Sequence, residues 1–170
     1  MKNASKNETR QPIMAIDPGA SGGIAWRQPN GVIRAITMPP GMTAIHALFK
    51  SILMENLGLE CYIEQVGAHF PGNRASASVK FGRHVGNLEA VLYCLGIPVR
   101  KPVAPVVWMK MFRPLPTGMA APQKLARKRA ILEKVSRMFP QCKVSLRTAD
   151  ALGILAWALG MPAPTVDWLE

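Results

Sequence analysis

The fold of this chain is decided near its start, by Ile13-Met14-Ala15-Ile16-Asp17-Pro18-Gly19-Ala20-Ser21-Gly22-Gly23-Ile24-Ala25-Trp26. The first apolar run predicts a buried strand, the Pro-Gly and Gly-Gly pairs predict a tight turn, and the second apolar run predicts a hairpin partner. Asp17 falls at the tip of the first strand. A buried carboxylate is costly unless a cation or turn amides compensate it, so Asp17 either caps the turn or belongs to a site.

The remaining segments alternate between predicted strands and helices. The expected strands are 31–38, 59–66 and an edge strand at 97–99. The expected helices are 43–57, 76–95 (or 78–95), 105–112, 123–139 and 149–159. Thr43 and Thr148 are the predicted caps of the first and last helices. This order predicts an α/β domain with an RNase H-like fold, in which a mixed five-stranded sheet carries helices on both faces.

Length and composition indicate a single domain. The chain has 170 residues, of which 49% are hydrophobic and 18% charged, enough for one well-formed core. We expect the domain to span 12–160, between a disordered polar segment (1–11) and a C-terminal tail (161–170). Three widely spaced cysteines favour a reducing compartment over a disulfide framework or zinc site. We expect neither a signal peptide nor a membrane span.

The positive charge is concentrated in one region. Between residues 100 and 147 there are twelve Lys and Arg residues and one acid, Glu133, so this region alone carries the whole net charge of +11. A solvated surface normally mixes both signs, whereas a block of one sign attracts a polyanion. The charge pattern therefore favours nucleic-acid binding over simple solubility, and no aromatic-rich amphipathic segment suggests a membrane surface.

Three carboxylates are expected at one end of the sheet. Glu64 ends the strand 59–66, and Asp150 lies in the first turn of the last helix. In an RNase H-like arrangement the first and fourth strands can be neighbours and the last helix lies at the same end, so Asp17, Glu64 and Asp150 can converge. Such oxygen-rich sites suit Mg²⁺ or Mn²⁺, and a pair of ions can activate water against a phosphodiester. The alternative is that Asp150 only interacts with the helix dipole.

Five short motifs occur in a fixed order along the chain. They are Ile16-Asp17-Pro18-Gly19 with Gly22-Gly23, Ile63-Glu64-Gln65-Val66, Phe81-Gly82-Arg83-His84-Val85-Gly86, Pro105 to Lys110 with Trp108, and Thr148-Ala149-Asp150-Ala151-Leu152. Together they make the chain, from about Ile13 to Leu159, resemble the RuvC-like Holliday-junction resolvases, and most closely the small bacteriophage versions.

The resemblance implies a function. Resolvases of this kind are crossover junction endodeoxyribonucleases of DNA recombination and repair. They are homodimers that hydrolyse phosphodiesters with Mg²⁺, or Mn²⁺ as a substitute, and make paired nicks across four-way junction DNA. By resemblance we expect one or two ions per active site, no nucleotide cofactor, no membrane contact, and a location in the cytoplasm of a bacterium or of a phage-infected host.

The resemblance also implies site residues. Asp17, Glu64 and Asp150 match the metal-binding catalytic carboxylates, and Lys124 lies near a basic position that assists them. Phe70 lies in the loop expected to enter the opened centre of the junction, where it either stacks on a base or anchors the loop. The residues expected to bind DNA are Phe70, Arg74, Lys80, Arg83, Lys110, Lys124, Arg127, Lys128 and Arg147.

One residue departs from the family pattern. Many members carry a fourth acidic residue or a histidine one turn before the final Asp, where this chain has Arg147. Arg cannot bind a cation and would partly neutralise the site. Another group then completes the site, only one ion binds tightly, or the protein binds junctions with weak or no cleavage. We expect cleavage to be retained with weakened occupancy of one metal position.

Other interpretations remain open at this stage. Asp-Pro-Gly beside a glycine turn also occurs in actin-like ATPases, but these need two copies of the fold around a cleft, and 170 residues hold only one. A non-catalytic junction- or RNA-binding module would need the basic region without the three placed carboxylates. Gly82 and Gly86, four residues apart on one helix face, either pack against the sheet or form a contact between subunits.

Overall fold

One mixed sheet lies at the centre of the fold. The computed structural model describes residues 11–65, 75–100, 102–118 and 120–162. Its strands are β1 (Ile13–Asp17), β2 (Gly23–Arg27), β3 (Ile33–Thr37) and β4 (Glu60–Ile63), in the order β3-β2-β1-β4. β1, β2 and β3 form an antiparallel meander, and β4 pairs with β1 in parallel. β1 is therefore a central strand, and Asp17 ends it.

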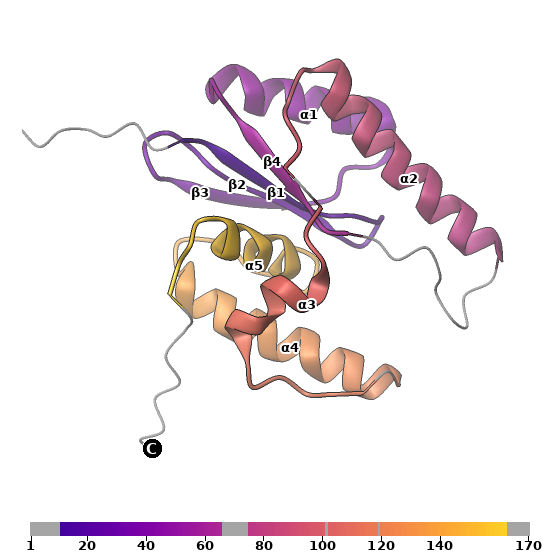
Figure 1. Ribbon diagram of the computed structural model, residues 1–170, viewed down its shortest axis with the longest axis vertical. Helices are drawn as coiled ribbons and strands as arrows, with labels where there is room; N and C mark the ends of the chain where they lie inside the picture. The colour runs from indigo at the N-terminus through magenta and orange to yellow at the C-terminus, as the bar shows by residue number, and fades with distance from the viewer. Residues whose placement is uncertain (1–10, 66–74, 101, 119, 163–170) are drawn as a thin grey trace, which may run out of the picture.

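Helices cover both faces of this sheet (Figure 1). They are α1 (Gly41–Glu55), α2 (Ala75–Cys94), α3 (Pro105–Trp108) continued by the 3₁₀ turn η1 (Met109–Phe112), α4 (Ala121–Met138) and α5 (Ala149–Ala158). α1 and α2 pack together on one face, α5 lies on the other, and α4 packs on the outside of α5. The predicted α/β class with helices on both faces is confirmed.

The prediction of a fifth strand is not confirmed, because the sheet has four strands in the described residues. The segment after α2 does run beside β4, but it forms only two isolated parallel bridges, Cys61 to Val99 and Glu64 to Val103. Between these two bridges lie two residues on the β4 side (62 and 63) and three on the other segment (100–102), so one residue is extra. Pro98 and Pro102 also lack the N–H groups that a regular ladder needs.

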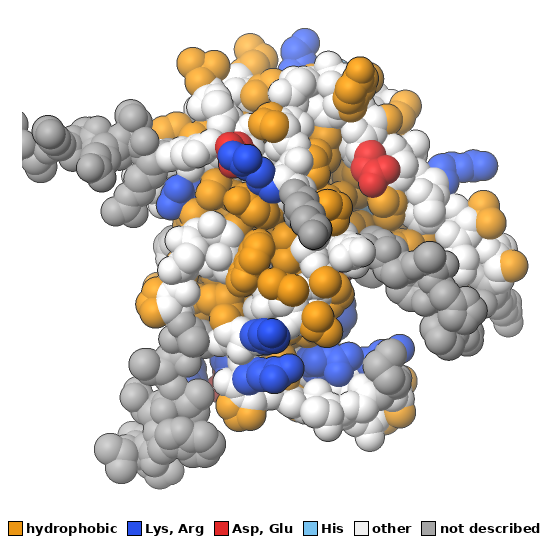
Figure 2. Space-filling model, viewed as in Figure 1, with side chains coloured by type: hydrophobic (Ala, Val, Ile, Leu, Met, Phe, Trp, Pro, Cys, Tyr) orange, Lys and Arg blue, Asp and Glu red, His pale blue; other side chains and the backbone are white. Residues whose placement is uncertain are grey.

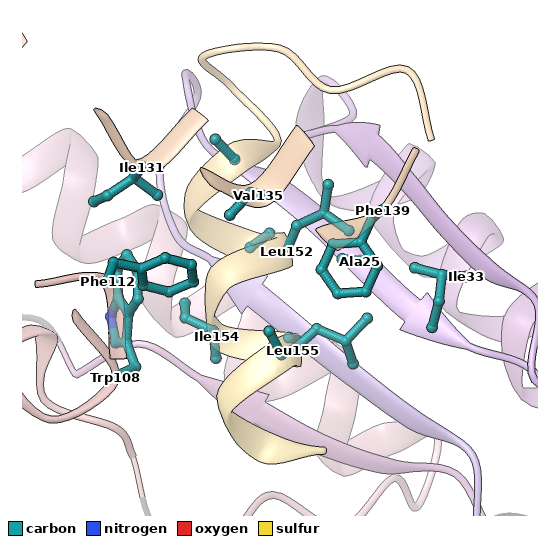
Figure 3. Packing of buried hydrophobic residues seen from close by; sticks show 14 of the residues in the cluster. Ala25, Ile33, Trp108, Phe112, Ile131, Val135, Phe139, Leu152, Ile154 and Leu155 are labelled. Carbon is teal, nitrogen blue, oxygen red and sulfur yellow. The ribbon is translucent and has the colours of Figure 1, made fainter. Parts of the chain in front are cut away.

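Two hydrophobic cores lie on opposite faces of the sheet. Side chains alternate along β1, so Met14 and Ile16 join the core under α1 and α2, whereas Ala15 joins the core under α5. Seven of the ten residues of α5 are buried. The helix lies between the sheet and α4 (Figure 3). Its apolar sequence reflects this central position, since a helix without a polar face must be covered all round.

The residues predicted to cap the helices do not do so in the structure. α1 begins at Gly41, two residues before Thr43, and α2 begins at Ala75, before either predicted serine. Thr148 does precede α5 but makes no side-chain cap bond. Its Oγ1 instead accepts a hydrogen bond from the amide of Ser145 at 3.0 Å. Thr148 therefore stabilises the loop before α5 and not the first turn of the helix.

All three cysteines are free thiols, as their spacing predicts. In the described part of the chain, none of the helices has both the length and the apolar character needed to cross a membrane.

Candidate active site

Asp17 and Glu64 lie at adjacent strand ends. Ile16 of β1 and Ile63 of β4 are parallel partners, and the amide of Glu64 donates to the carbonyl of Ile16 at 3.0 Å. Both isoleucines point into the core under α1 and α2. Because side chains alternate, the next residues, Asp17 and Glu64, point to the other face of the sheet, toward the α5 layer.

Asp150 approaches the same place from α5. It lies in the first turn of that helix, which packs directly on β1 and β2. Its side chain is only 14% exposed, and Asp17 is also buried. The predicted convergence of strand β1, strand β4 and the last helix is therefore the arrangement that the structure has. We call Asp17, Glu64 and Asp150 the acidic cluster.

The three carboxyl groups of the acidic cluster perturb one another. Burial, together with repulsion from Asp150 and Glu64, raises the pKa of Asp17 to about 8. Burial raises the pKa of Glu64 to about 7, although a hydrogen bond from Trp108 opposes the shift. Burial also raises the pKa of Asp150, against the influence of Lys128. Buried carboxylates that repel one another are the environment that a bound cation relieves.

Lys128 supplies a positive charge to the acidic cluster. Its Nζ lies 3.3 Å from Oδ2 of Asp150. Burial alone would lower the pKa of Lys128, but attraction from Asp150, Asp17 and Glu64 raises it. The sequence predicted Lys128 as a DNA-binding residue only. Helical spacing could have predicted that Lys128 lies near the acidic cluster. It is one turn after Lys124 and three residues before the buried Ile131, so it lies near the buried face of the helix.

Glu64 is held by a buried aromatic residue. The indole Nε1 of Trp108 donates to Oε1 of Glu64 at 2.9 Å. Trp108 is almost fully buried, packs edge-on against Phe112, and faces Gly153 of α5, where an added Cβ would come within 2.7 Å of the indole ring. The sequence identified Trp108 as part of a motif without giving it a role. Its contacts assign it the role of fixing one oxygen of Glu64.

The glycine turn after Asp17 permits close backbone approach. A Cβ on Gly22 would lie 2.1 Å from the carbonyl oxygen of Asp17, and a Cβ on Gly23 would lie 2.5 Å from that of Arg147. No side chain fits at either position. The absence of side chains lets the loop before α5 pack against the start of β2, which brings Asp150 close to the end of β1.

Arg147 lies in the loop before α5 and contacts the glycine turn after Asp17. Its guanidinium donates to the carbonyl of Ala20, between Asp17 and β2 in the sequence, and its side chain is exposed. Among the described residues, Arg147 makes no ion pair with the acidic cluster, so the expectation that it neutralises these carboxylates is not confirmed. The cation in contact with the cluster is Lys128.

The other predicted DNA-binding residues lie on several elements. Lys124 and Arg127 are on α4, Lys110 is exposed on η1, and Lys80 and Arg83 are exposed on α2. Arg127 lowers the pKa of Asp150 and donates to the carbonyls of Pro116 and Gly118. In the view of Figure 2, basic side chains gather at the level of α3 and α4. Phe70 and Arg74 lie outside the described residues.

The donor chemistry of the acidic cluster fits a hard divalent cation. Three carboxylates and no imidazole or thiolate suit Mg²⁺ or Mn²⁺, and their raised pKa values show that a positive charge is needed to ionise them together. As placed, no three His, Cys, Asp or Glu side chains in the described ranges are arranged as ligands of one metal ion. To share one ion, the three carboxylates would therefore have to draw closer together.

Comparison with solved structures identifies the class of fold. The order of the strands and the helices on both faces define a mixed α/β fold of the RNase H-like kind. RuvC from Thermus thermophilus matches with a TM-score of 0.52 and 18% identity over 91% of this chain and 99% of that chain. T. thermophilus RuvC in complex with a Holliday junction substrate matches with a TM-score of 0.53 and 16% identity, over 92% and 100%.

The two matches confirm the sequence resemblance at the level of the fold, so this chain has the fold of RuvC. No protein-family model matches the chain. No curated protein matches it by sequence either. The roles of individual residues remain predictions, and they depend on the geometry described above.

Proposed function

We propose that this protein is a structure-selective endonuclease that resolves four-way DNA junctions by metal-dependent phosphodiester hydrolysis with paired nicks. One observation carries the proposal: three largely buried carboxylates lie at one end of the sheet, close enough to influence one another's pKa, next to the basic helix α4. The RuvC fold supports it, because one of the matched RuvC structures is in complex with a Holliday junction substrate.

Asp17, Glu64 and Asp150 would hold Mg²⁺ or Mn²⁺. When bound, the cation would act as a Lewis acid, activating water and stabilising charge on the phosphate. Trp108 holds Oε1 of Glu64, so this carboxylate is oriented before any ligand arrives. The glycine turn and the loop before α5 keep Asp17 and Asp150 side by side.

The basic residues of α4 would bring the DNA backbone to these carboxylates. Lys124 and Lys128 are one turn apart and therefore on the same helix face, and Lys128 already contacts Asp150. A phosphate approaching the acidic cluster needs such cations, because carboxylates alone repel it. The lysines also supply the sequence-independent part of DNA affinity.

We further propose that the protein acts as a homodimer formed through α2. A Cβ added to Gly82 or Gly86 would meet no atom within 4 Å, so this face does not pack against the sheet in the described structure. Val79 and Tyr93 lie on the same face at helical spacing and are 64% and 87% exposed. Two such faces could approach closely, and two active sites would explain paired nicks.

A cleavage experiment tests the proposal. Labelled mobile four-way junctions are incubated with the protein across a range of Mg²⁺ and Mn²⁺ concentrations, beside Asp17→Asn and a linear duplex of the same sequence. We expect paired nicks in the junction only, and their loss in Asp17→Asn. Junction binding without nicks in either metal, with Asp17→Asn identical to the wild type, would instead support a junction-binding protein without cleavage.

A further inference from the structure

We propose that the ammonium group of Lys128 is a built-in cation of the acidic cluster, which takes the place of a second divalent ion so that each active site binds one metal. The inference rests on the proposed function, because it concerns how the same carboxylates are neutralised. It changes the metal count expected from the family resemblance, which was one or two ions per site.

The position of Lys128 follows from how α4 packs. Ile131 and Val135 are buried against α5, and Lys128 lies three and seven residues before them, on the same face of the helix. Figure 3 shows Ile131 and Val135 pointing toward α5. Lys128 therefore extends the buried face of α4 toward the first turn of α5, where its Nζ lies 3.3 Å from Asp150 Oδ2.

The register of α4 is held from another side as well. The Nζ of Lys134 donates to the carbonyl of Phe112 at 2.6 Å and to that of Pro114 at 3.1 Å. These bonds, together with the buried apolar residues, oppose rotation of the helix about its axis. Packing thus fixes the part of α4 that carries Lys128, whose side chain is itself 46% exposed.

The charges at the acidic cluster match one divalent ion. Three ionised carboxylates and one ammonium group leave two negative charges, which a single divalent cation neutralises. A second divalent ion would have to compete with the ammonium group of Lys128 for this charge. No fourth acid is available three residues before Asp150, because that residue is Arg147, whose guanidinium donates to the carbonyl of Ala20. With three carboxylates and no fourth acid, the site has enough negative charge for one divalent ion and one ammonium group.

Metal stoichiometry is the direct test. Binding of Mn²⁺ to the protein without DNA is measured by titration calorimetry and by the electron paramagnetic resonance signal of free Mn²⁺. The variants are Lys128→Met, which removes the charge; Lys128→Arg, which keeps it; and Lys50→Met, an exposed lysine on α1, as the matched control. Lys128→Gln is a second neutral variant in case methionine disturbs folding, which circular dichroism monitors.

We expect one Mn²⁺ per chain for the wild type, Lys128→Arg and Lys50→Met, and a second, weaker ion for Lys128→Met and Lys128→Gln. Two ions per chain in the wild type, or one ion in both neutral variants, would overturn the inference. The proposed function fails separately, if the wild type binds Mn²⁺ but cuts no junction. If the wild type binds no Mn²⁺ at all, both the inference and the metal-dependent mechanism are wrong.

Discussion

The layer formed by α4 and α5 and the layer formed by α1 and α2 cover opposite faces of one sheet, yet they expose different surfaces. α4 presents lysines and arginines beside the acidic cluster, whereas α2 presents two open glycines between exposed Val79 and Tyr93. This difference is the basis for the separate tasks that we propose for the two faces: chemistry and DNA contact on the α4–α5 side, and assembly on the α2 side.

The largest expected effect comes from a variant that disables only the α4–α5 side. Asp150→Asn removes a carboxylate that the cation needs, so we expect junction cleavage to fall by about 10³-fold or more, since several kcal/mol of transition-state stabilisation are lost. Junction affinity should remain or increase. Single-turnover cleavage and gel-shift assays measure the two quantities, and equal losses in both would contradict the division of tasks.

The converse change disables the α2 side alone. Gly86→Leu places a large side chain on the open face, so we expect a monomer in sedimentation analysis and loss of paired nicking by about 10-fold or more, with single nicks retained. The fold itself should tolerate the change, because a Cβ there meets nothing within 4 Å and leucine has the higher helix propensity. Gly86→Ala is the matched small control. An unchanged oligomeric state would remove α2 as the interface.

Without metal, the acidic cluster should make the free energy of unfolding depend on pH. The pKa of Asp17 is raised to about 8, above its usual value near 4, so the folded state binds this proton more tightly than the unfolded state. The stabilisation is complete below pH 4 and is lost as pH rises through 8. In EDTA, the free energy of unfolding should therefore fall by about 1–3 kcal/mol between pH 6 and 8.

Asp17→Asn should flatten this pH dependence. Glu133→Gln, at an exposed position on α4, is the control and should leave the profile unchanged. Urea titrations at several pH values supply the measurement. Parallel profiles for the wild type and Asp17→Asn would mean that Asp17 is not the group responsible.

The smallest expected effect concerns how DNA affinity depends on salt concentration, which should differ between variants of the two layers. Lys124→Gln on α4 should reduce the slope of log affinity against log salt concentration by about 1, the value for one lost phosphate contact. Lys50→Gln on α1 should leave the slope unchanged. Fluorescence anisotropy with a labelled junction measures both. Equal slopes for the two variants would show that DNA does not contact this part of α4.

Much of the fold follows from local pattern. The hairpin 13–26 was predicted because apolar runs flank a Pro-Gly and Gly-Gly turn, and α5 because Leu152, Leu155 and Leu159 recur at helical spacing after Thr148. The fifth strand was not confirmed: an edge position was expected to tolerate Pro98, but the segment forms only two isolated bridges, because Pro98 and Pro102 lack N–H groups. The start of α1 was predicted two residues late, because Thr43 lies inside the helix, whereas α5 begins at the predicted residue although Thr148 makes no side-chain cap bond.

The sequence by itself determined which carboxylates stand at element ends, that the positive charge is confined to one region, and which family the chain resembles. These are local or compositional properties. Only the tertiary structure decided that Lys128 contacts Asp150, that Trp108 holds Glu64, and that Arg147 bonds to the turn. Each of these contacts joins residues more than twenty positions apart, so it depends on how α4, α5 and the strand ends pack, which no local pattern encodes.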